Sequence, residues 1–192
     1  MSQRSIVSLF KPTSVAVIGA SDNPTRAGRA IMRNLLSGGF SGPIMPVTPK
    51  YTAVMGVLAY PNIEALPVKP DLAIICTADH RVPSIIERLA QFGCKAAIIM
   101  ASGMADTFDD NGVSLLALTQ QHAKRYGMRI LGPNSLGMIL PTIGLNASLA
   151  HASAKAGKVA FVSQSAAICT TVLDWANNKD IGFSSFISLG DA

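Results

Sequence analysis

The chain alternates short, almost entirely apolar runs with longer segments whose apolar residues recur at helical spacing, and this alternation limits the fold more than any other feature. The apolar runs lie at 14–19, 43–47, 72–76, 95–100 and 128–131, and the helical patterns lie at 28–38, 82–92 and 113–126. Strands that are apolar on both faces are typical of a parallel sheet, in which a helical crossover joins neighbouring strands. This part of the chain therefore predicts an α/β fold with a doubly wound parallel sheet.

The alternation is interrupted after residue 131. Residues 132–144 are rich in glycine and proline, and residues 145–156 are small, polar and weakly patterned. A strand, a helix and a strand are then predicted at 158–162, 166–177 and 183–189. One such unit rarely buries enough surface to be stable alone. We therefore predict a domain over 1–140, a linker over 141–156 and the start of a second, apparently truncated domain over 157–192. Proteases should cut preferentially between about residues 145 and 157.

Composition excludes several classes of protein. Charged residues make up 14% of the chain and the mean hydropathy is +0.36, which argues against disorder. No apolar run approaches the roughly 20 residues that a transmembrane helix needs, and the N-terminal stretch lacks the pattern of a secretory signal. The three cysteines have no CxxC spacing, which argues against a disulfide framework or a zinc site. We therefore expect a cytoplasmic protein without a resident metal.

The excess positive charge is concentrated near the N-terminus. The net charge is +5, and the first fifty residues hold six basic residues and one acidic residue. The rest of the chain holds ten of each kind. This asymmetry indicates an anionic partner bound by the first quarter of the chain, unless these residues only form a solubilising surface.

The loop after the first predicted strand, GASDNPTRAG at 19–28, has the position at which doubly wound sheets bind phosphate groups. Amide groups at the N-terminus of the next helix, and the helix dipole, favour an anion there. Gly19 permits a tight turn, and Gly28 permits a close approach of the helix to the sheet. The loop is longer than a GxGxxG turn, so a plain connection without a ligand is the alternative.

The residues at the end of the second predicted strand distinguish a site for NAD from a site for a nucleotide with a phosphate on its ribose. NAD sites usually carry an acidic residue there, which binds the ribose 2′-hydroxyl, whereas this chain has VTPK at 47–50. Lys50 suits a phosphate on the ribose, as in NADP or coenzyme A, and such a charge-assisted contact is worth roughly 1.5–3 kcal/mol. The alternative is a lysine that is only solvated.

Other turns carry small or polar residues. Residues 76–78 and 101–103 follow the third and fourth strands, where an extended ligand could lie against backbone amides. Ser163, Gln164 and Ser165 precede the helix of the second unit and form either a phosphate cradle or, for Ser165, a plain N-cap. A nucleophile elbow is absent from the sequence, and the three histidines lack metal-ligand spacing, so we assign no catalytic residue.

Five stretches together resemble a known family: SVAVIGAS, PVTPK, GPNSLG, FVSQSAA and GFSSFISLGDA. They are similar to the CoA-binding half of the NDP-forming acyl-CoA synthetases, the superfamily of the succinyl-CoA ligase α-subunit. Residues 26–51, and SQSAA in place of the SQSG usual in synthetases, most resemble the bacterial Pat-type protein lysine acetyltransferases.

The resemblance implies a Rossmann-like CoA-binding domain followed by the start of a flavodoxin-like, ligase-type domain. The positions that match the family's CoA contacts are Gly19, Ala20, Ser21, Arg26, Lys50, Thr77, Ser102 and Asn134. Ser163, Gln164 and Ser165 match the helix that faces the phosphohistidine in active synthetases, although Ala166 replaces the synthetase glycine. The resemblance also implies that the histidine, an ATP-grasp domain that handles ATP and ADP, and an acetyltransferase domain lie beyond Ala192.

We therefore expect a regulatory part of a larger protein lysine acetyltransferase, which binds coenzyme A or acetyl-CoA and has no complete active site of its own. Protein substrates would be met through the downstream acetyltransferase domain. Nucleic acid and membranes are not expected as partners, and self-association is left open. The alternatives are the α-part of an ADP-forming acetyl-CoA synthetase, an NADP-binding oxidoreductase or redox-sensing domain, and an interaction domain with a vestigial pocket.

Overall fold

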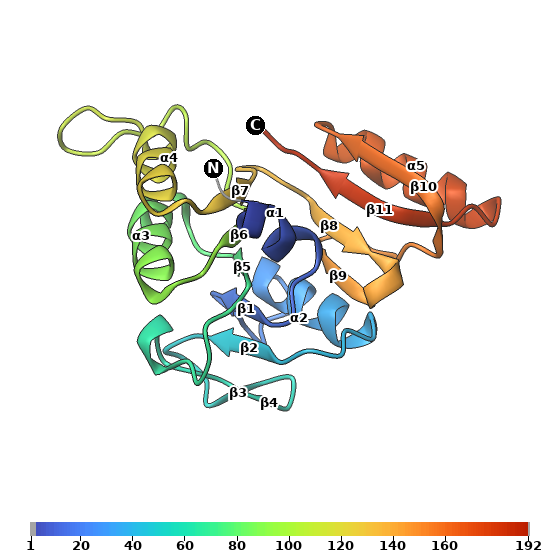
Figure 1. Ribbon diagram of the computed structural model, residues 1–192, viewed down its shortest axis with the longest axis horizontal. Helices are drawn as coiled ribbons and strands as arrows, with labels where there is room; N and C mark the ends of the chain where they lie inside the picture. The colour runs from blue at the N-terminus through green and yellow to red at the C-terminus, as the bar shows by residue number, and fades with distance from the viewer. Residues whose placement is uncertain (1–2, 192) are drawn as a thin grey trace.

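The computed structural model describes residues 3–191 and places a five-stranded parallel sheet in the first part of the chain (Figure 1). Its strands are β1 (Val15–Ile18), β2 (Ile44–Val47), β5 (Leu72–Ile75), β6 (Ala96–Ile99) and β7 (Arg129–Leu131), in the order β2-β1-β5-β6-β7. All neighbouring pairs are parallel. The chain runs outward from β1 to β2 and then crosses back to β5. This confirms the predicted doubly wound sheet, whose direction of winding changes beside the carboxyl end of β1.

Helices cover both faces of this sheet. The helices α1 (Gln3–Phe10) and α2 (Ala27–Ser37) lie on one face, and α3 (Val82–Phe92) and α4 (Leu115–Tyr126) lie on the other. Successive strand residues point to opposite faces, so Val15 and Val17 belong to the core under α2, whereas Ala16 and Ile18 belong to the core under α3. The strands β1, β5 and β6 are buried at every position, as expected between two helical layers.

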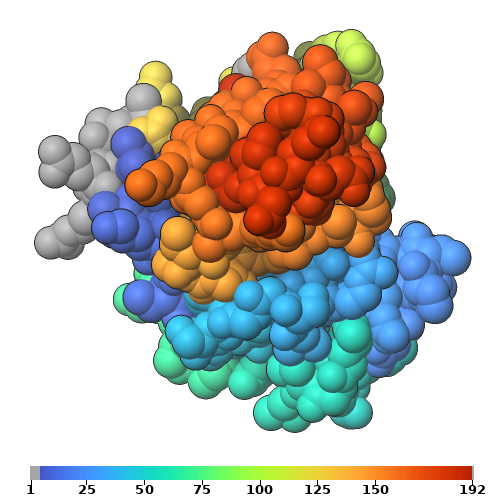
Figure 2. All heavy atoms as spheres, turned by 90° about the vertical axis from the view of Figure 1, so that its right-hand side faces the viewer, coloured from blue at the N-terminus to red at the C-terminus, as the bar shows by residue number. Residues whose placement is uncertain are grey.

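A second, four-stranded sheet has the order β10-β11-β8-β9. Its elements are β8 (Gly137–Leu140), β9 (Leu145–Ser148), β10 (Ala156–Ser163), α5 (Ala166–Asn178) and β11 (Phe183–Ser188). The strands β10 and β11 are parallel, whereas β8 is antiparallel to both β9 and β11. Figure 2 shows this part of the chain, in orange and red, lying directly on the blue segment around α2.

The interval 141–156, predicted as a linker, is not an open connection. It contains the 3₁₀ helix η3 (Pro141–Ile143) and the strand β9, which is buried at every position. The side-chain amide of Asn34, in α2, donates hydrogen bonds to the carbonyl oxygens of Ser148 and Ala150, at 2.8 Å each. The interval is weakly patterned because its strand is covered on both sides and built from small residues. The division of the chain into domains at 140 and 157 stays a prediction.

Short elements surround the carboxyl ends of the parallel strands. A hairpin of β3 (Ala53–Val54) and β4 (Val57–Leu58) follows β2, the 3₁₀ helix η1 (Ile63–Ala65) leads toward β5, and η2 (Asp79–Arg81) leads directly into α3. Among residues 3–191, none of the helices has the length and apolarity needed to cross a membrane.

Candidate functional site

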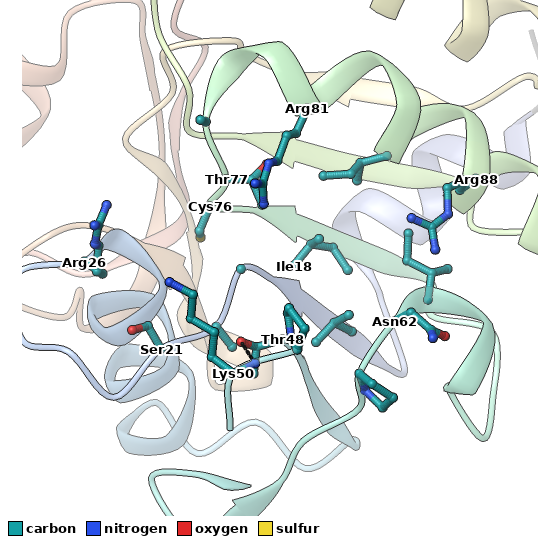
Figure 3. Close-up of a pocket in the computed structure, with 18 of the residues that line it drawn as sticks. Ile18, Ser21, Arg26, Thr48, Lys50, Asn62, Cys76, Thr77, Arg81 and Arg88 are labelled. Atoms are coloured by element: carbon teal, nitrogen blue, oxygen red, sulfur yellow. Dashed lines mark hydrogen bonds between the residues drawn. The ribbon is translucent and has the colours of Figure 1, made fainter. Parts of the chain in front are cut away.

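A cavity of about 480 Å³ opens at the carboxyl ends of β1, β2 and β5 (Figure 3). One wall consists of the loop between β1 and α2 together with residues 47–51 at the end of β2. The opposite wall consists of residues 76–78, η2 and the first turns of α3, and residues 61–63 close a third side. Doubly wound sheets bind their ligands beyond the carboxyl ends of the strands, where the direction of winding changes, and the cavity lies at that point.

Two glycines allow the loop between β1 and α2 to pass close to its neighbours. Gly19 has a φ of +87°, and a Cβ on it would lie 3.0 Å from the carbonyl oxygen of Cys76. A Cβ on Gly28 would lie 2.1 Å from the carbonyl oxygen of Gly19. Both glycines therefore serve the roles predicted from the sequence: Gly19 has the positive φ of a tight turn, and a side chain on Gly28 would push the helix away from the strand.

Four cations line the cavity, and none of the lining residues identified in the described chain is an aspartate or glutamate. Arg26, Lys50 and Arg81 have no carboxylate within 4.0 Å among residues 3–191. Arg88 forms a two-pronged ion pair with Glu64, in which Nε lies 2.9 Å from Oε1, and the hydrogen bonds from Arg88 lower the pKa of Glu64. The cavity thus presents three uncompensated positive charges to an anion.

Helix α2 begins at the cavity without a side-chain cap. Arg26 is its N-cap residue, with φ −97° and ψ 140°, and the Arg26 side chain makes no cap hydrogen bond. Asp22, the acidic residue of this loop, is engaged elsewhere, because its Oδ1 accepts from Nη1 of Arg29 at 2.8 Å and from the backbone N–H of Met55 at 3.0 Å. An anion beside α2 would supply the acceptor that the first turn lacks.

Two side chains at the end of β5, those of Thr77 and Cys76, limit the kind of ligand that the cavity can bind. The hydroxyl oxygen of Thr77 is buried and has no hydrogen-bond partner in the described part of the chain. A buried polar group left unpaired costs about 1–3 kcal/mol, and a turn of the Thr77 side chain toward an oxygen of a bound ligand would relieve this cost. Burial raises the pKa of the Cys76 thiol to about 12, so Cys76 lines the cavity as a neutral group and not as a nucleophile. The residues present fit a ligand that carries phosphate groups, as coenzyme A does.

The structure brings six of the predicted ligand contacts together. The predicted residues that line the cavity are Gly19, Ala20, Ser21, Arg26, Lys50 and Thr77. Ser102 and Asn134 do not line it: Ser102 is exposed after β6, and the Asn134 side chain donates to Oδ1 of Asp191 at 3.0 Å. Both follow neighbouring strands of the same sheet, β6 and β7, so they lie farther along its carboxyl edge.

The residues Ser163, Gln164 and Ser165 lie apart from this cavity, in the turn between β10 and α5. The Ser165 hydroxyl accepts from the N–H of Ile168 at 3.3 Å, and the Ser163 hydroxyl accepts from the N–H of Ser165 at 3.1 Å. Ser165 is therefore an N-cap of α5, as one of the two sequence interpretations had it. The phosphate-facing role of this turn stays a prediction.

Sequence analysis missed the part of the site that α3 provides. The side chains of Arg81, Ser84, Ile85 and Arg88 all line the cavity. Their spacing of three, four and seven residues is that of one helix face. The spacing was present in the sequence, but no site residue was predicted on the helix at 82–92.

Comparison with protein families agrees with this geometry. Residues 13–141 match the family described as CoA binding domain, and residues 156–192 match the succinyl-CoA ligase like flavodoxin domain. The chain is 37% identical over 183 residues to acetate–CoA ligase (ADP-forming) I of Archaeoglobus fulgidus, covering 95% of this chain and 26% of that protein. It is 35% identical over 191 residues to the α-subunit of acetate–CoA ligase (ADP-forming) I of Pyrococcus furiosus, covering 97% of this chain and 41% of that subunit.

A solved structure shows the same arrangement. The acetyl-coenzyme A synthetase 1 of Ca. Korarchaeum cryptofilum, in complex with phosphate and ADP, superposes with a TM-score of 0.90 at 34% identity, over 98% of this chain and 40% of that one. The present chain thus spans about a quarter to two fifths of these relatives. It belongs to the CoA-binding domain family, in the form that the succinyl-CoA-ligase-like, NDP-forming acyl-CoA synthetases contain.

Proposed function

We propose that the chain is the CoA-binding part of an ADP-forming acyl-CoA synthetase, an acid–thiol ligase, and that the cavity binds the 3′-phospho-ADP end of CoA or acetyl-CoA. The observation that carries the proposal is the set of unpaired cations in the cavity, one of which, Arg26, lies at the uncapped start of α2. A pyrophosphate and a third phosphate carry the charge that such a site needs, and bound CoA supplies the thiol that accepts the acyl group.

The relatives named above favour the ligase over the lysine acetyltransferase that the sequence first suggested. They are ADP-forming acetate–CoA ligases, and a further relative, 34% identical over 186 residues, is a second such ligase of Archaeoglobus fulgidus. No acetyltransferase is among these proteins. We therefore take the ligase, first named as an alternative, as the proposed activity of the whole protein, with ATP and ADP handled by parts outside this chain.

Each group in the cavity receives a role under this proposal. The loop from Gly19 to Ser21 and the first turn of α2, with Arg26, bind the pyrophosphate. Lys50 binds the phosphate on the ribose, and the Thr77 hydroxyl donates to a ligand oxygen. Ser102 and Asn134 lie outside the cavity, so we assign them to the part of CoA that extends beyond its 3′-phospho-ADP end. Ser163 to Ser165 keep the proposed role of facing a phosphate group.

The proposal is tested by calorimetric titration of the 192-residue chain with CoA, acetyl-CoA, dephospho-CoA, NADP and NAD. CoA and acetyl-CoA should bind most tightly, and dephospho-CoA should bind more weakly because it lacks the 3′-phosphate. NAD should bind most weakly, because it also lacks this phosphate and its nicotinamide ring adds a positive charge. Lys50→Ala should narrow the gap between CoA and dephospho-CoA and weaken the dependence of CoA binding on salt.

Two outcomes would contradict the proposal. Equal affinity of the wild-type chain for CoA and dephospho-CoA would remove Lys50 from the site. Tight binding of NADP without binding of CoA would favour the oxidoreductase alternative.

A further inference from the structure

One face of helix α3, together with the residue that precedes the helix, lines the cavity as a continuous stripe of side chains. The roles assigned so far do not use this stripe. The stripe consists of Arg81, Ser84, Ile85 and Arg88. It has an arginine at each end, and the apolar Ile85 lies between them. Because α3 follows β5, whereas Lys50 follows β2, the stripe forms the wall that faces Lys50 across the end of β1.

The two arginines differ in what they can offer a ligand. Arg88 is held by Glu64 through two hydrogen bonds, so its charge is largely compensated. Arg81 has no carboxylate within 4.0 Å among residues 3–191. Asp79, the acid nearest to it in sequence, is turned to other groups: its Oδ1 accepts from the N–H of His80 at 2.8 Å, and its Oδ2 accepts from the Thr107 hydroxyl at 3.3 Å. The Arg81 guanidinium is therefore available.

The position of Arg81 is unfavourable in the free protein. It immediately precedes α3, where the aligned backbone dipoles already produce positive potential. Its side chain makes no cap hydrogen bond. A cation placed there without a partner lowers the stability of the helix. An anion bound between the guanidinium and the helix N-terminus would instead raise it.

A second, independent observation marks the same corner of the cavity as a place for a ligand oxygen. The Thr77 hydroxyl, which follows β5 and precedes η2, is buried and unpaired in the described structure. Figure 3 shows Thr77 and Arg81 on one side of the cavity and Lys50 on the opposite side. Residues with donor groups therefore line two walls of the same cavity.

We propose that Arg81 binds the ribose 3′-phosphate together with Lys50, and that this second cation sets the preference of the site for CoA over ligands that lack the phosphate. The inference rests on the proposed function. The pyrophosphate is already provided for by the start of α2 and Arg26, so the remaining pair of free cations, Lys50 and Arg81, meets the remaining phosphate. A phosphate monoester carries about two negative charges near neutral pH and is matched by two cations better than by one.

The test compares CoA with dephospho-CoA, which differ only in the 3′-phosphate, on the full 192-residue chain. Arg81→Ala should weaken CoA binding about tenfold or more and change dephospho-CoA binding less than about twofold. Arg81→Lys should recover part of the loss, because it keeps the charge but not the fork of donors. The double variant Lys50→Ala/Arg81→Ala should bind the two ligands equally. Lys179→Ala, which removes an exposed cation from the end of α5, should match the wild type.

Thermal unfolding without ligand separates a binding role from a structural one. Arg81→Ala should keep or raise the Tm of the free chain, because it removes a cation from the positive end of α3 and breaks no ion pair found in residues 3–191. A lowered Tm together with an equal loss of both ligands would make Arg81 a structural residue and overturn the inference.

Unchanged binding of CoA by Arg81→Ala would place Arg81 outside the site and would also overturn the inference, while the proposed function would stand. A wild-type chain that binds no CoA would instead overturn both.

Discussion

Arg26 shows at the scale of one residue how this chain favours a ligand over local stability. Helix N-caps are usually serine, threonine, aspartate or asparagine, whose short side chains accept a hydrogen bond from the first turn. Helix α2 has an arginine at this position and no side-chain cap. A cation at the N-terminus of a helix costs about 0.3–1 kcal/mol. The residue is consistent with a helix whose N-terminus is completed by a bound anion.

Gly28 carries the first stability prediction. An alanine there would bring its Cβ within 2.1 Å of the carbonyl oxygen of Gly19, a backbone atom that cannot move without displacing β1 or α2. Gly28→Ala should therefore lower the free energy of unfolding by about 3 kcal/mol. Gly39→Ala is the matched control, because Gly39 has a φ of +82° but no atom within 4 Å of the added Cβ. It should cost only about 1 kcal/mol.

Urea denaturation of the two variants measures the difference. A Gly28→Ala variant as stable as Gly39→Ala would show that the loop and α2 can separate, and the close approach of the helix to the strand would lose its role in the site.

At the scale of elements, the central sheet was predictable and the connection to the second sheet was not. The strands β1, β5 and β6 are apolar at every position because both of their faces are covered, and this signal is local in the sequence. The strand β9, LNAS, is equally buried, but three of its four residues are small or polar. Its burial depends on α2, more than a hundred residues earlier in the chain, and no local pattern reports such a contact.

The residues of the candidate site also differ in whether they could be predicted from the sequence. The glycine loop and Lys50 follow strand ends, where the general rule for doubly wound sheets places ligand contacts, so sequence alone identified them. Arg88 lies on α3 and Arg81 immediately precedes it, so their relevance depends on which face of α3 turns toward the cavity. Ser102 and Asn134 also follow strand ends, but they follow β6 and β7, which lie on the side of β5 away from β1. Strand order, which the sequence does not state, separates them from the cavity.

The prediction at the scale of elements concerns Asn34 and the stability of the contact between α2 and β9. Its amide donates to two carbonyl oxygens beyond β8, those of Ser148 and Ala150, and it is buried. Asn34→Ala should lower the free energy of unfolding by about 2 kcal/mol, since two buried acceptors lose their donor. It should also make residues 145–156 more sensitive to proteases, as first expected of the wild type. Ser37→Ala is the control, because its hydroxyl bonds only within α2, to the carbonyl oxygen of Asn34 at 3.3 Å.

Limited proteolysis followed by mass spectrometry reports both effects. Cleavage of the wild type within 145–156 at the rate of the Asn34→Ala variant would show that the hydrogen bonds of Asn34 do not protect this interval, as expected of a linker.

At the scale of the whole molecule, we expect the chain to bind its ligand without catalysing a reaction by itself. Burial raises the pKa of the thiols of Cys76 and Cys94 to about 12 and raises that of Cys169, so thiolate is scarce near neutral pH. The purified 192-residue chain should bind CoA but produce no acetyl-CoA from acetate, ATP and CoA. Chromatographic detection of acetyl-CoA and ADP, with CoA binding measured on the same sample, checks this. Production of acetyl-CoA that disappears with Lys50→Ala would contradict it.

The hydrogen bonds of Asn34 have a mechanical consequence. One end of α2 faces the cavity, and the other end is fastened to the strand layer that carries α5. With 11 residues, this helix is about 16 Å long. If an anion bound at its first turn shifts α2, we expect β8 and β9 to move with the helix. Occupancy of the cavity would then change the orientation of the second sheet.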